Sequence, residues 1–257
     1  MTLLAAEIVE RFYTFLWPML RISALLMAAP LFSLDALTVR IRIMLAMTIT
    51  FLVYPLVDWP VIDPISANGL LQIVNQLFIG AMMGLMLQVV VGAISLAGQT
   101  IAGSMGLSMA SMVDPNIGNV PVISQFLVIM STLIFLGFGG HVIMLSMVID
   151  SFQTVPIGKL ILGQVAFGKV VAWSGMMFLG GVLIALPVMI SLLFINIGLG
   201  IVTRAAPSLN IFSVGFPASI AAGFLVLILS LDSIGGRMLW LWMQGFSHAK
   251  DLVGLTQ

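Results

Sequence analysis

Long, mainly apolar stretches alternate with short polar connections along almost the whole chain. They cover approximately residues 12–34, 41–57, 70–113, 122–149, 170–203 and 209–231. These stretches lack the alternation of apolar and polar positions that is typical of barrel strands, and backbone groups in lipid must be satisfied within the spanning structure. The pattern therefore predicts an all-α polytopic membrane protein with six apolar helical segments, or seven if the longest stretch is a hairpin.

The stretch over residues 70–113 contains no charged residue and is about twice as long as one helix needs to cross a hydrocarbon core. We therefore expect it to fold back or to break. Its first part carries small and amide side chains at helical spacing: Gly80, Gly84, Gln88, Gly92, Ser95, Gln99 and Gly103. Such a stripe lets another helix approach closely.

The end of this stretch changes from oily residues to glycine, serine and methionine. Three glycines weaken helical persistence there, each by about 1 kcal/mol relative to alanine: Gly98, Gly103 and Gly106. Asp114 and Pro115 then favour a turn. Between these signals lie three methionines, whose unbranched side chains pack against changing neighbours: Met105, Met109 and Met112. Two interpretations remain open, namely a soft plug that opens and recloses, or a loop packed against protein inside a helix bundle.

Charges at the connections bear on the number of membrane crossings. Arg40 and Arg42 favour the cytoplasmic side for the first connection, whereas Asp58 and Asp63 favour the opposite side for the second. Lys159 and Lys169 again favour the cytoplasm. These placements agree if the long stretch enters and returns as a hairpin, which favours seven crossings.

Composition excludes several classes of function. The 257 residues are 61% hydrophobic and 7% charged, with a mean hydropathy of +1.24, so the chain is not an ordinary soluble domain. Nine acidic residues balance nine basic ones, which leaves no basic surface for nucleic acid. The chain has no cysteine, which excludes disulfides, thiolate metal sites and cysteine nucleophiles.

Isolated polar residues within the apolar segments are the remaining candidates for chemistry. A lone cation such as Arg21 costs on the order of 3 kcal/mol in lipid, so its side chain should face protein or water. It would then act either as an ion relay or in a structural contact with a carboxylate or with carbonyls. We favour the structural contact. Arg204 is expected at a helix C-terminus, and Asn196 across a helix interface. Asp150 and Asp232 are expected at helix ends.

The sequence contains no recognisable catalytic motif. It has no Walker loop, no His-Glu-x-x-His helix and no G-x-S-x-G elbow, and His141 has no His, Asp or Glu at helical ligand spacing. The prediction is a non-enzyme without metal or cofactor. A secondary transporter for a small solute is the main rival, because such proteins also have broken apolar segments. It would need buried ionisable groups for coupling, and here Arg21 and His141 are the candidates.

The chain reads as one domain over residues 1–257, because no Ser-, Gly- or charge-rich linker divides it. The longest polar connection covers residues 150–169, and the remainder of the chain resembles two long antiparallel helices joined at RAAPSLN. Two parts within one bundle, residues 1–169 and 170–257, are therefore possible.

Four strings together resemble the FliR family of export-gate proteins in flagellar type III secretion. They are RISALLMAAPLF (21–32), VRIRIMLAMTITFLVYP (39–55), GQTIAGSMGLSMASMVDP (98–115) and LGIVTRAAPSLNIFSVGFP (199–217). The resemblance covers nearly the whole chain in the right order. A related subunit of the virulence-associated injectisome is an alternative.

The resemblance implies a role in a membrane complex. FliR-like proteins assemble with FliP and FliQ subunits, joined by FlhB, into a closed gate for unfolded flagellar substrates. That gate belongs to the flagellar basal body in the bacterial inner membrane, with helical hairpins lifted out of the lipid toward the periplasm. Residues 1–169 would be FliP-like and residues 170–257 a FliQ-like hairpin.

The same resemblance implies roles for particular residues. The family's gating loop maps onto residues 103–119, where the plug interpretation is now favoured. Its candidate residues are Gly103, Met105, Gly106, Leu107, Met109, Met112, Asp114 and Pro115. Four polar residues are expected to act in structural or inter-subunit contacts: Arg21, Gln99, Asn196 and Arg204.

Overall fold

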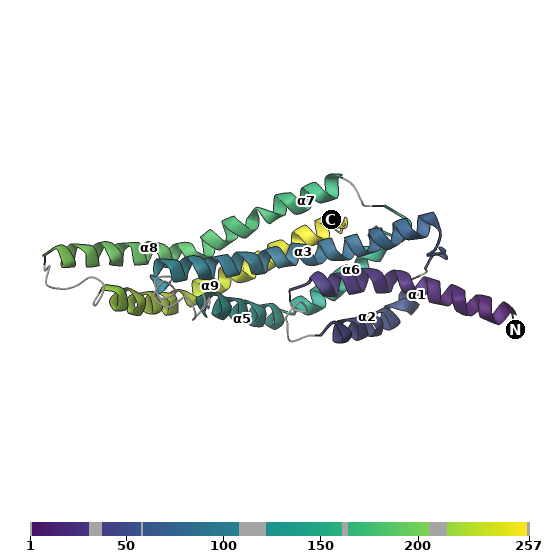
Figure 1. Cartoon of the computed structure of the whole chain (residues 1–257), viewed down its shortest axis with the longest axis horizontal. Coiled ribbons are helices and arrows are strands. Elements are labelled where there is room, and N and C mark those ends of the chain that lie inside the picture. Colours follow the sequence, from purple (N-terminus) through teal and green to yellow (C-terminus); the bar gives the residue numbers. More distant parts are fainter. Residues whose placement is uncertain are drawn as a thin grey trace. The chain divides into compact units, whose positions relative to one another are not determined.

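The described part of the chain is built of helices (Figure 1). The computed structural model describes residues 2–30, 38–57, 59–107, 122–160, 164–205 and 215–255. Its elements are α1 (Thr2–Ala28), α2 (Val39–Val53), the 3-10 helix η1 (Tyr54–Leu56), α3 (Ala67–Ser104), α5 (Val122–Gly137), α6 (Gly140–Thr154), α7 (Gln164–Ser174), α8 (Met176–Ala205) and α9 (Phe216–Leu252). No strand occurs in these ranges, so the all-α prediction is confirmed.

Four segments are long and apolar enough to cross a membrane: Val39–Leu56, Ala67–Ser104, Val165–Ala205 and Phe216–Leu252. A fifth is added if α5 and α6, bent by 65° relative to each other, count as one span. The expectation of seven crossings is therefore wrong for the described residues. One reason is that α1, which contains Pro18 and the buried Arg21, is not among these segments.

Helix α3 runs without a break from Ala67 to Ser104, so the hairpin expected within residues 70–113 does not form in this part of the stretch. Its 38 residues correspond to about 57 Å at 1.5 Å per residue, well beyond a hydrocarbon core of about 30 Å. In its apolar window 56% of the residues are buried, compared with 22% for α9. Protein contacts therefore cover much of α3, and this packing holds its glycines in helical conformation.

Two other boundaries differ from the expected segments. The apolar stretch over residues 122–149 is divided near Gly139, whose φ of 77° lies in the left-handed region. Helix α9 continues well past residue 231, so Asp232 lies inside a helix, exposed to the surroundings, and the expectation of a helix end there is wrong. Asp150 does lie in the last turns of α6.

Packing divides the chain into two compact units. The first comprises Met1–Val89, Gly139–Ser174 and Met243–Gln257, and the second comprises Val90–Phe138 and Gly175–Trp242. Helices α3 and α9 each contribute residues to both units. The proposed division into residues 1–169 and 170–257 concerns family likeness and stays a prediction.

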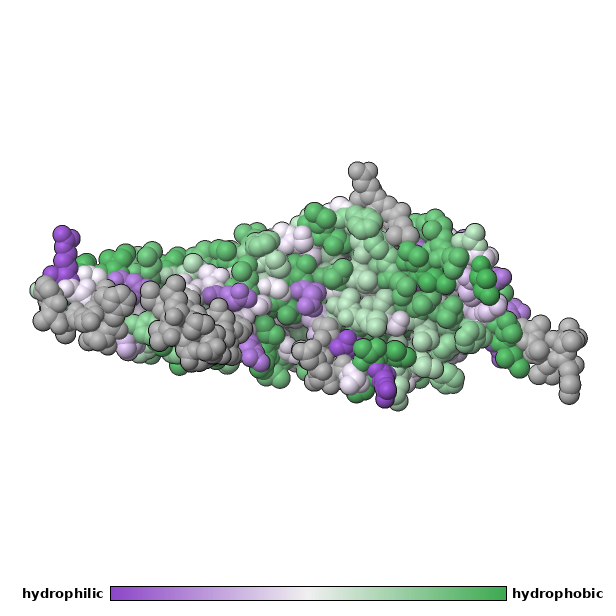
Figure 2. Space-filling model, viewed as in Figure 1, coloured by the Kyte–Doolittle hydropathy of each residue, from purple (hydrophilic) through white to green (hydrophobic). Residues whose placement is uncertain are grey.

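Apolar side chains cover much of the visible surface (Figure 2). Among the exposed apolar side chains of α8 and α9, Phe194 is 69% exposed and Leu229 is 76% exposed. Contiguous apolar surface of this kind is typical of proteins that contact lipid or other subunits. The fold is thus that of a polytopic membrane protein.

Candidate functional site

The start of the predicted gating loop is a glycine-terminated helix end. The N–H of Met105 still donates to the Ile101 carbonyl at 3.0 Å, and the N–H of Gly106 donates to the Gly103 carbonyl at 3.0 Å. Gly106 has a φ of 83°, a left-handed conformation that commonly comes after a helix C-terminus and that suits glycine because it has no Cβ. Here the glycine stops α3 directly after Ser104.

Met105 and Gly106 attach this helix end to α9. The Met105 side chain is completely buried, and a Cβ on Gly223 would lie only 2.6 Å from its Cε atom. A Cβ on Gly106 would lie 3.3 Å from the ring of Phe216, the first residue of α9. The chain therefore enters the loop from a point held against α9.

The other loop candidates fall into two groups. Gly103 is exposed, and a Cβ added to it would meet no described atom within 4 Å, while Leu107 is half-buried. The remaining candidates lie outside the described residues: Met109, Met112, Asp114 and Pro115. Their roles stay predictions.

The small-residue stripe of α3 brings neighbouring helices close, as the sequence predicts. A Cβ on Gly84 would lie 2.6 Å from the Cβ of Ala28 in α1, and one on Gly92 would lie 2.9 Å from the sulfur of Met177 in α8. Gly98, which the sequence singles out as a helix-weakening residue, allows close contact with the backbone of Ser124 in α5. Gly84 and Gly98 are thus required for packing, because a methyl group would meet the backbone of the partner helix, whereas at Gly92 it would meet only the flexible side chain of Met177.

A serine pair joins α3 to α5 beside this crossing. The hydroxyl of Ser124 donates to the Ser95 carbonyl at 2.9 Å and lies 3.0 Å from the Ser95 hydroxyl. Gln99, one helical turn further on, donates to the Ser95 hydroxyl at 3.2 Å and is exposed. Its amide is therefore accessible at the surface of this unit.

Arg21 lies in a fully buried polar cluster between α1, α3 and α6. Its Nε donates to the Gln76 side-chain oxygen at 2.8 Å, its Nη1 to the carbonyl and hydroxyl of Ser151 at 2.9 and 3.0 Å, and its Nη2 to the Val155 carbonyl at 2.9 Å. The guanidinium carbon lies 4.3 Å from the centre of the Phe152 ring. Oxygens from outside α1 thus satisfy the cation without a carboxylate, which is the arrangement expected of a structural arginine.

Three buried amides on α3 extend this cluster, and the sequence analysis missed them. They are Gln72, Asn75 and Gln76, each at most 1% exposed. Asn75 donates to the Lys159 carbonyl at 2.8 Å, and the Gln72 oxygen accepts from the N–H of Gly158 at 3.2 Å. Gln72 and Asn75 thus hold the turn that comes after α6. Their spacing of three and four residues on an apolar helix is the signal that could have identified them.

Comparison with known proteins assigns the family. Residues 12–244 match the family described as "Bacterial export proteins, family 1". The chain belongs to this family. The match runs from α1 into α9 and therefore includes both the Arg21 cluster and the end of α3.

Relatives within this export family carry the name "Flagellar biosynthetic protein FliR". The protein from Pectobacterium carotovorum subsp. carotovorum is 38% identical, over 95% of this chain and 93% of the relative. Those from Escherichia coli (strain K12) and Bacillus subtilis (strain 168) are 34% and 31% identical, over 93% and 89% of this chain and 92% and 90% of their own lengths. The resemblance to FliR is thereby confirmed.

In this FliR-family chain the polar residues of α8 lie at the positions expected from the sequence. The Asn196 oxygen accepts from the Ser219 hydroxyl of α9 at 2.9 Å, which links the two helices. Arg204 is exposed in the last turn of α8, where a cation interacts favourably with the helix dipole. No group of three or more His, Cys, Asp or Glu suited to a metal ion occurs among the described residues.

Proposed function

We propose that this chain is a non-enzymatic subunit of the flagellar type III export gate, where it helps to close a pore for unfolded flagellar substrates. The observation that carries the proposal is the match to the bacterial export family over residues 12–244, together with relatives named as flagellar biosynthetic proteins. It is supported by the end of α3, where Met105 and Gly106 hold the first residues of a glycine- and methionine-rich loop against α9.

The proposed mechanism is an apolar constriction with one fixed end. An apolar constriction excludes water and ions until a substrate displaces the side chains that form it. Met105 is buried against Gly223 and serves as the anchor. Met109 and Met112 come next in the chain as the displaceable part of the seal, because methionine adapts to many neighbouring sequences.

The proposed partners are FliP and FliQ subunits, FlhB and unfolded export substrates, within the flagellar basal body of the bacterial inner membrane. The exposed apolar faces of α8 and α9 support subunit and lipid contacts. The length of α3 supports hairpins that project beyond the lipid toward the periplasm, because about 57 Å exceeds the hydrocarbon thickness. The flagellar name of the relatives favours this system over an injectisome.

A secondary transporter is less well supported. Coupled transport uses ionisable groups that line a substrate or ion pathway. The guanidinium of Arg21 is instead bonded on three sides by Gln76, Ser151 and Val155. It therefore stabilises helix packing and is occupied by protein oxygens.

The leak of the closed gate tests the proposal. The double variant Met109→Ser, Met112→Ser is co-expressed with FliP, FliQ and FlhB, and ion conductance is measured after reconstitution into vesicles. Conductance should rise, because polar side chains hydrate the constriction. Deletion of residues 103–112 should have the same effect.

A matched control is the double variant Met44→Ser, Met47→Ser on α2, where both side chains are exposed. It changes the same residue type at the same number of positions outside the loop. Conductance equal to that of the unmodified gate, in a loop variant that assembles fully, would remove the loop from the seal.

A further inference from the structure

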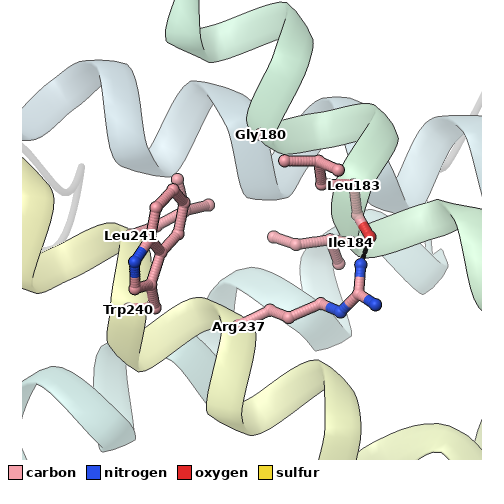
Figure 3. Close-up of a pocket in the computed structure, with 6 residues that line it drawn as sticks. All are labelled: Gly180, Leu183, Ile184, Arg237, Trp240 and Leu241. Carbon is pink, nitrogen blue, oxygen red and sulfur yellow. Dashed lines mark hydrogen bonds between the residues drawn. The ribbon is translucent and has the colours of Figure 1, made fainter.

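A pocket of about 230 Å³ lies between α8 and α9 and has one cation in its lining (Figure 3). Its lining residues are Gly180, Leu183, Ile184, Arg237, Trp240 and Leu241. Trp240 and Leu241 lie on one side in Figure 3, and Leu183 and Ile184 lie on the other beside the Arg237 guanidinium. The pocket is therefore apolar apart from one arginine.

A proline in α8 explains why Arg237 is held here. Pro187 has no N–H, so the carbonyl of Leu183, four residues earlier, lacks its helical donor. The Nη1 atom of Arg237 donates to that carbonyl. This bond uses one of the five N–H donors of the guanidinium. The two ion pairs found among the described residues, Arg11–Glu7 and Lys169–Asp251, do not involve Arg237. A cation with unused donors is thus fixed at an apolar pocket.

The position of the pocket along α8 matches a boundary of the hydrocarbon. Helix α8 has no charged residue before Arg204, and Leu183 lies 21 residues, or about 32 Å, before this arginine along the helix. This is close to the hydrocarbon thickness of about 30 Å. The side chains exposed along this length include Ile190, Phe194 and Ile197. With Arg204 at one boundary, the level of Leu183 therefore lies about one hydrocarbon thickness away.

Helix α9 shows the same boundary independently. It is uncharged from Phe216 through Leu231, after which come Asp232, Arg237 and the 46% exposed Trp240. Tryptophan is enriched at the level of lipid headgroups, and arginine near a boundary extends its charge toward them. Both helices thus place the pocket where acyl chains meet phosphates.

We propose that this pocket binds a phospholipid, with Arg237 on the phosphate and an acyl chain against Leu241 and Trp240. The planar guanidinium matches phosphate oxygens and forms charge-assisted hydrogen bonds to them. The proposal rests on the membrane location of the α8–α9 hairpin and is independent of the gating loop. The bound lipid would fix α8 near Pro187 against α9, because the guanidinium of Arg237 would contact both the lipid phosphate and the Leu183 carbonyl.

Lipid binding to the purified, delipidated export complex tests the site. Native mass spectrometry measures the binding of phosphatidylglycerol, of diacylglycerol without phosphate, and of phosphatidylglycerol in the presence of inorganic phosphate. Arg237→Gln should weaken phosphatidylglycerol binding by about tenfold or more, the loss expected for a hydrogen bond to a charged group. Diacylglycerol should bind about equally weakly to both forms.

Further variants separate lipid binding from folding. Trp240→Ala removes an apolar wall but leaves the bond between Arg237 and Leu183, so it should also weaken phosphatidylglycerol binding even if Arg237→Gln misfolds. Arg11→Gln is the matched control on α1, because Arg11 is exposed and paired with Glu7. It should bind phosphatidylglycerol as the unmodified complex does.

Three results would overturn the proposal. Unchanged phosphatidylglycerol binding in both pocket variants would exclude the site. Displacement of the lipid by equimolar inorganic phosphate would indicate a site for a free anion. Loss of FliP or FliQ from the Arg237→Gln complex without loss of lipid would assign the arginine to an acidic group of a partner subunit. None of these results concerns ion leak, so failure here is distinguishable from failure of the gate proposal.

Discussion

Single buried polar residues hold together segments that are far apart in the sequence. Arg21 donates to Ser151, 130 residues later, and Asn75 donates to Lys159, 84 residues later. Arg21, Ser151 and Asn75 each have 0% exposure. Leaving a buried polar atom without its partner costs about 1–3 kcal/mol, so these contacts specify the packing of α1, α3 and α6.

Arg21→Met should lower the free energy of unfolding by about 3 kcal/mol or more, because several buried hydrogen bonds to a charged group are lost. The substitution leaves the oxygens of Gln76, Ser151 and Val155 without their donor. Arg21→Lys should recover only part of the loss, because an ammonium group lacks the planar fork that reaches the acceptors on all three residues. Denaturant unfolding in detergent, followed by circular dichroism, measures both effects.

The control for this series is Arg11→Gln, which removes an exposed pair with Glu7 one helical turn away. Such pairs contribute about 0.2–0.5 kcal/mol. A midpoint for Arg21→Met that is as high as that of Arg11→Gln would show that the buried cluster contributes little to stability.

At the scale of elements, glycines with positive φ decide where helices end. Gly106 lies just after the end of α3, and Gly139 precedes α6 at the 65° bend from α5. Other glycines, such as Gly84 and Gly98, remain within α3 because they pack against neighbouring helices. The same residue type therefore breaks one helix and stabilises the packing of another, depending on its neighbours.

Gly139→Ala should destabilise the protein by about 1–2 kcal/mol, the cost of a left-handed conformation for an L-residue. A Cβ there would meet no described atom within 4 Å, so the effect would come from the backbone alone. Gly137→Ala is the matched control, since its Cβ would be equally free of described neighbours and its φ is not positive. It should be neutral or slightly stabilising. Thermal unfolding of the Gly139→Ala and Gly137→Ala variants measures the difference. Equal unfolding midpoints for the two variants would argue against the bend at Gly139.

At the scale of the whole molecule, helices α8 and α9 form an antiparallel pair with an apolar surface. Gly180 lies against Leu241 near one end of the pair, whereas Asn196 bonds to Ser219 near the other. Residue numbers thus rise on α8 as they fall on α9. This is the hairpin expected after residue 170, and its exposed apolar side chains suit a membrane complex.

A disulfide across this pair tests the arrangement, because the chain has no cysteine of its own. Asn196→Cys combined with Ser219→Cys should form an intramolecular disulfide on mild oxidation, since the two side chains lie in hydrogen-bond contact. Asn196→Cys with Ser233→Cys is the control, because Ser233 lies 14 residues, or about 21 Å, further along α9. Thiol labelling with mass detection measures coupling. Equal coupling in the two pairs would contradict the register.

Much of the fold depends on local patterns that the sequence displays. Apolar runs without alternation indicate helices, and small residues at helical spacing indicate a close crossing on α3. Gly98, Gly103 and Gly106 indicate a weakened helix toward the end of the long stretch, where α3 ends at Ser104. These features depend on residues within a few turns of each other. Four short strings were also enough to indicate the FliR family, to which the chain belongs.

Features that depend on contacts between distant residues could not be predicted from local sequence patterns. The length of residues 70–113 and the charges on either side suggest a hairpin, yet packing against α1, α5 and α8 keeps α3 helical through Ser104. Hydropathy marks Arg21 as costly in lipid, but its acceptors lie up to 134 residues away. Nor does the sequence of α8 reveal that Arg237 donates to the carbonyl that Pro187 leaves without a helical partner. Local preference acts over one or two turns, whereas the partner of a buried polar group is known only once the helices have packed.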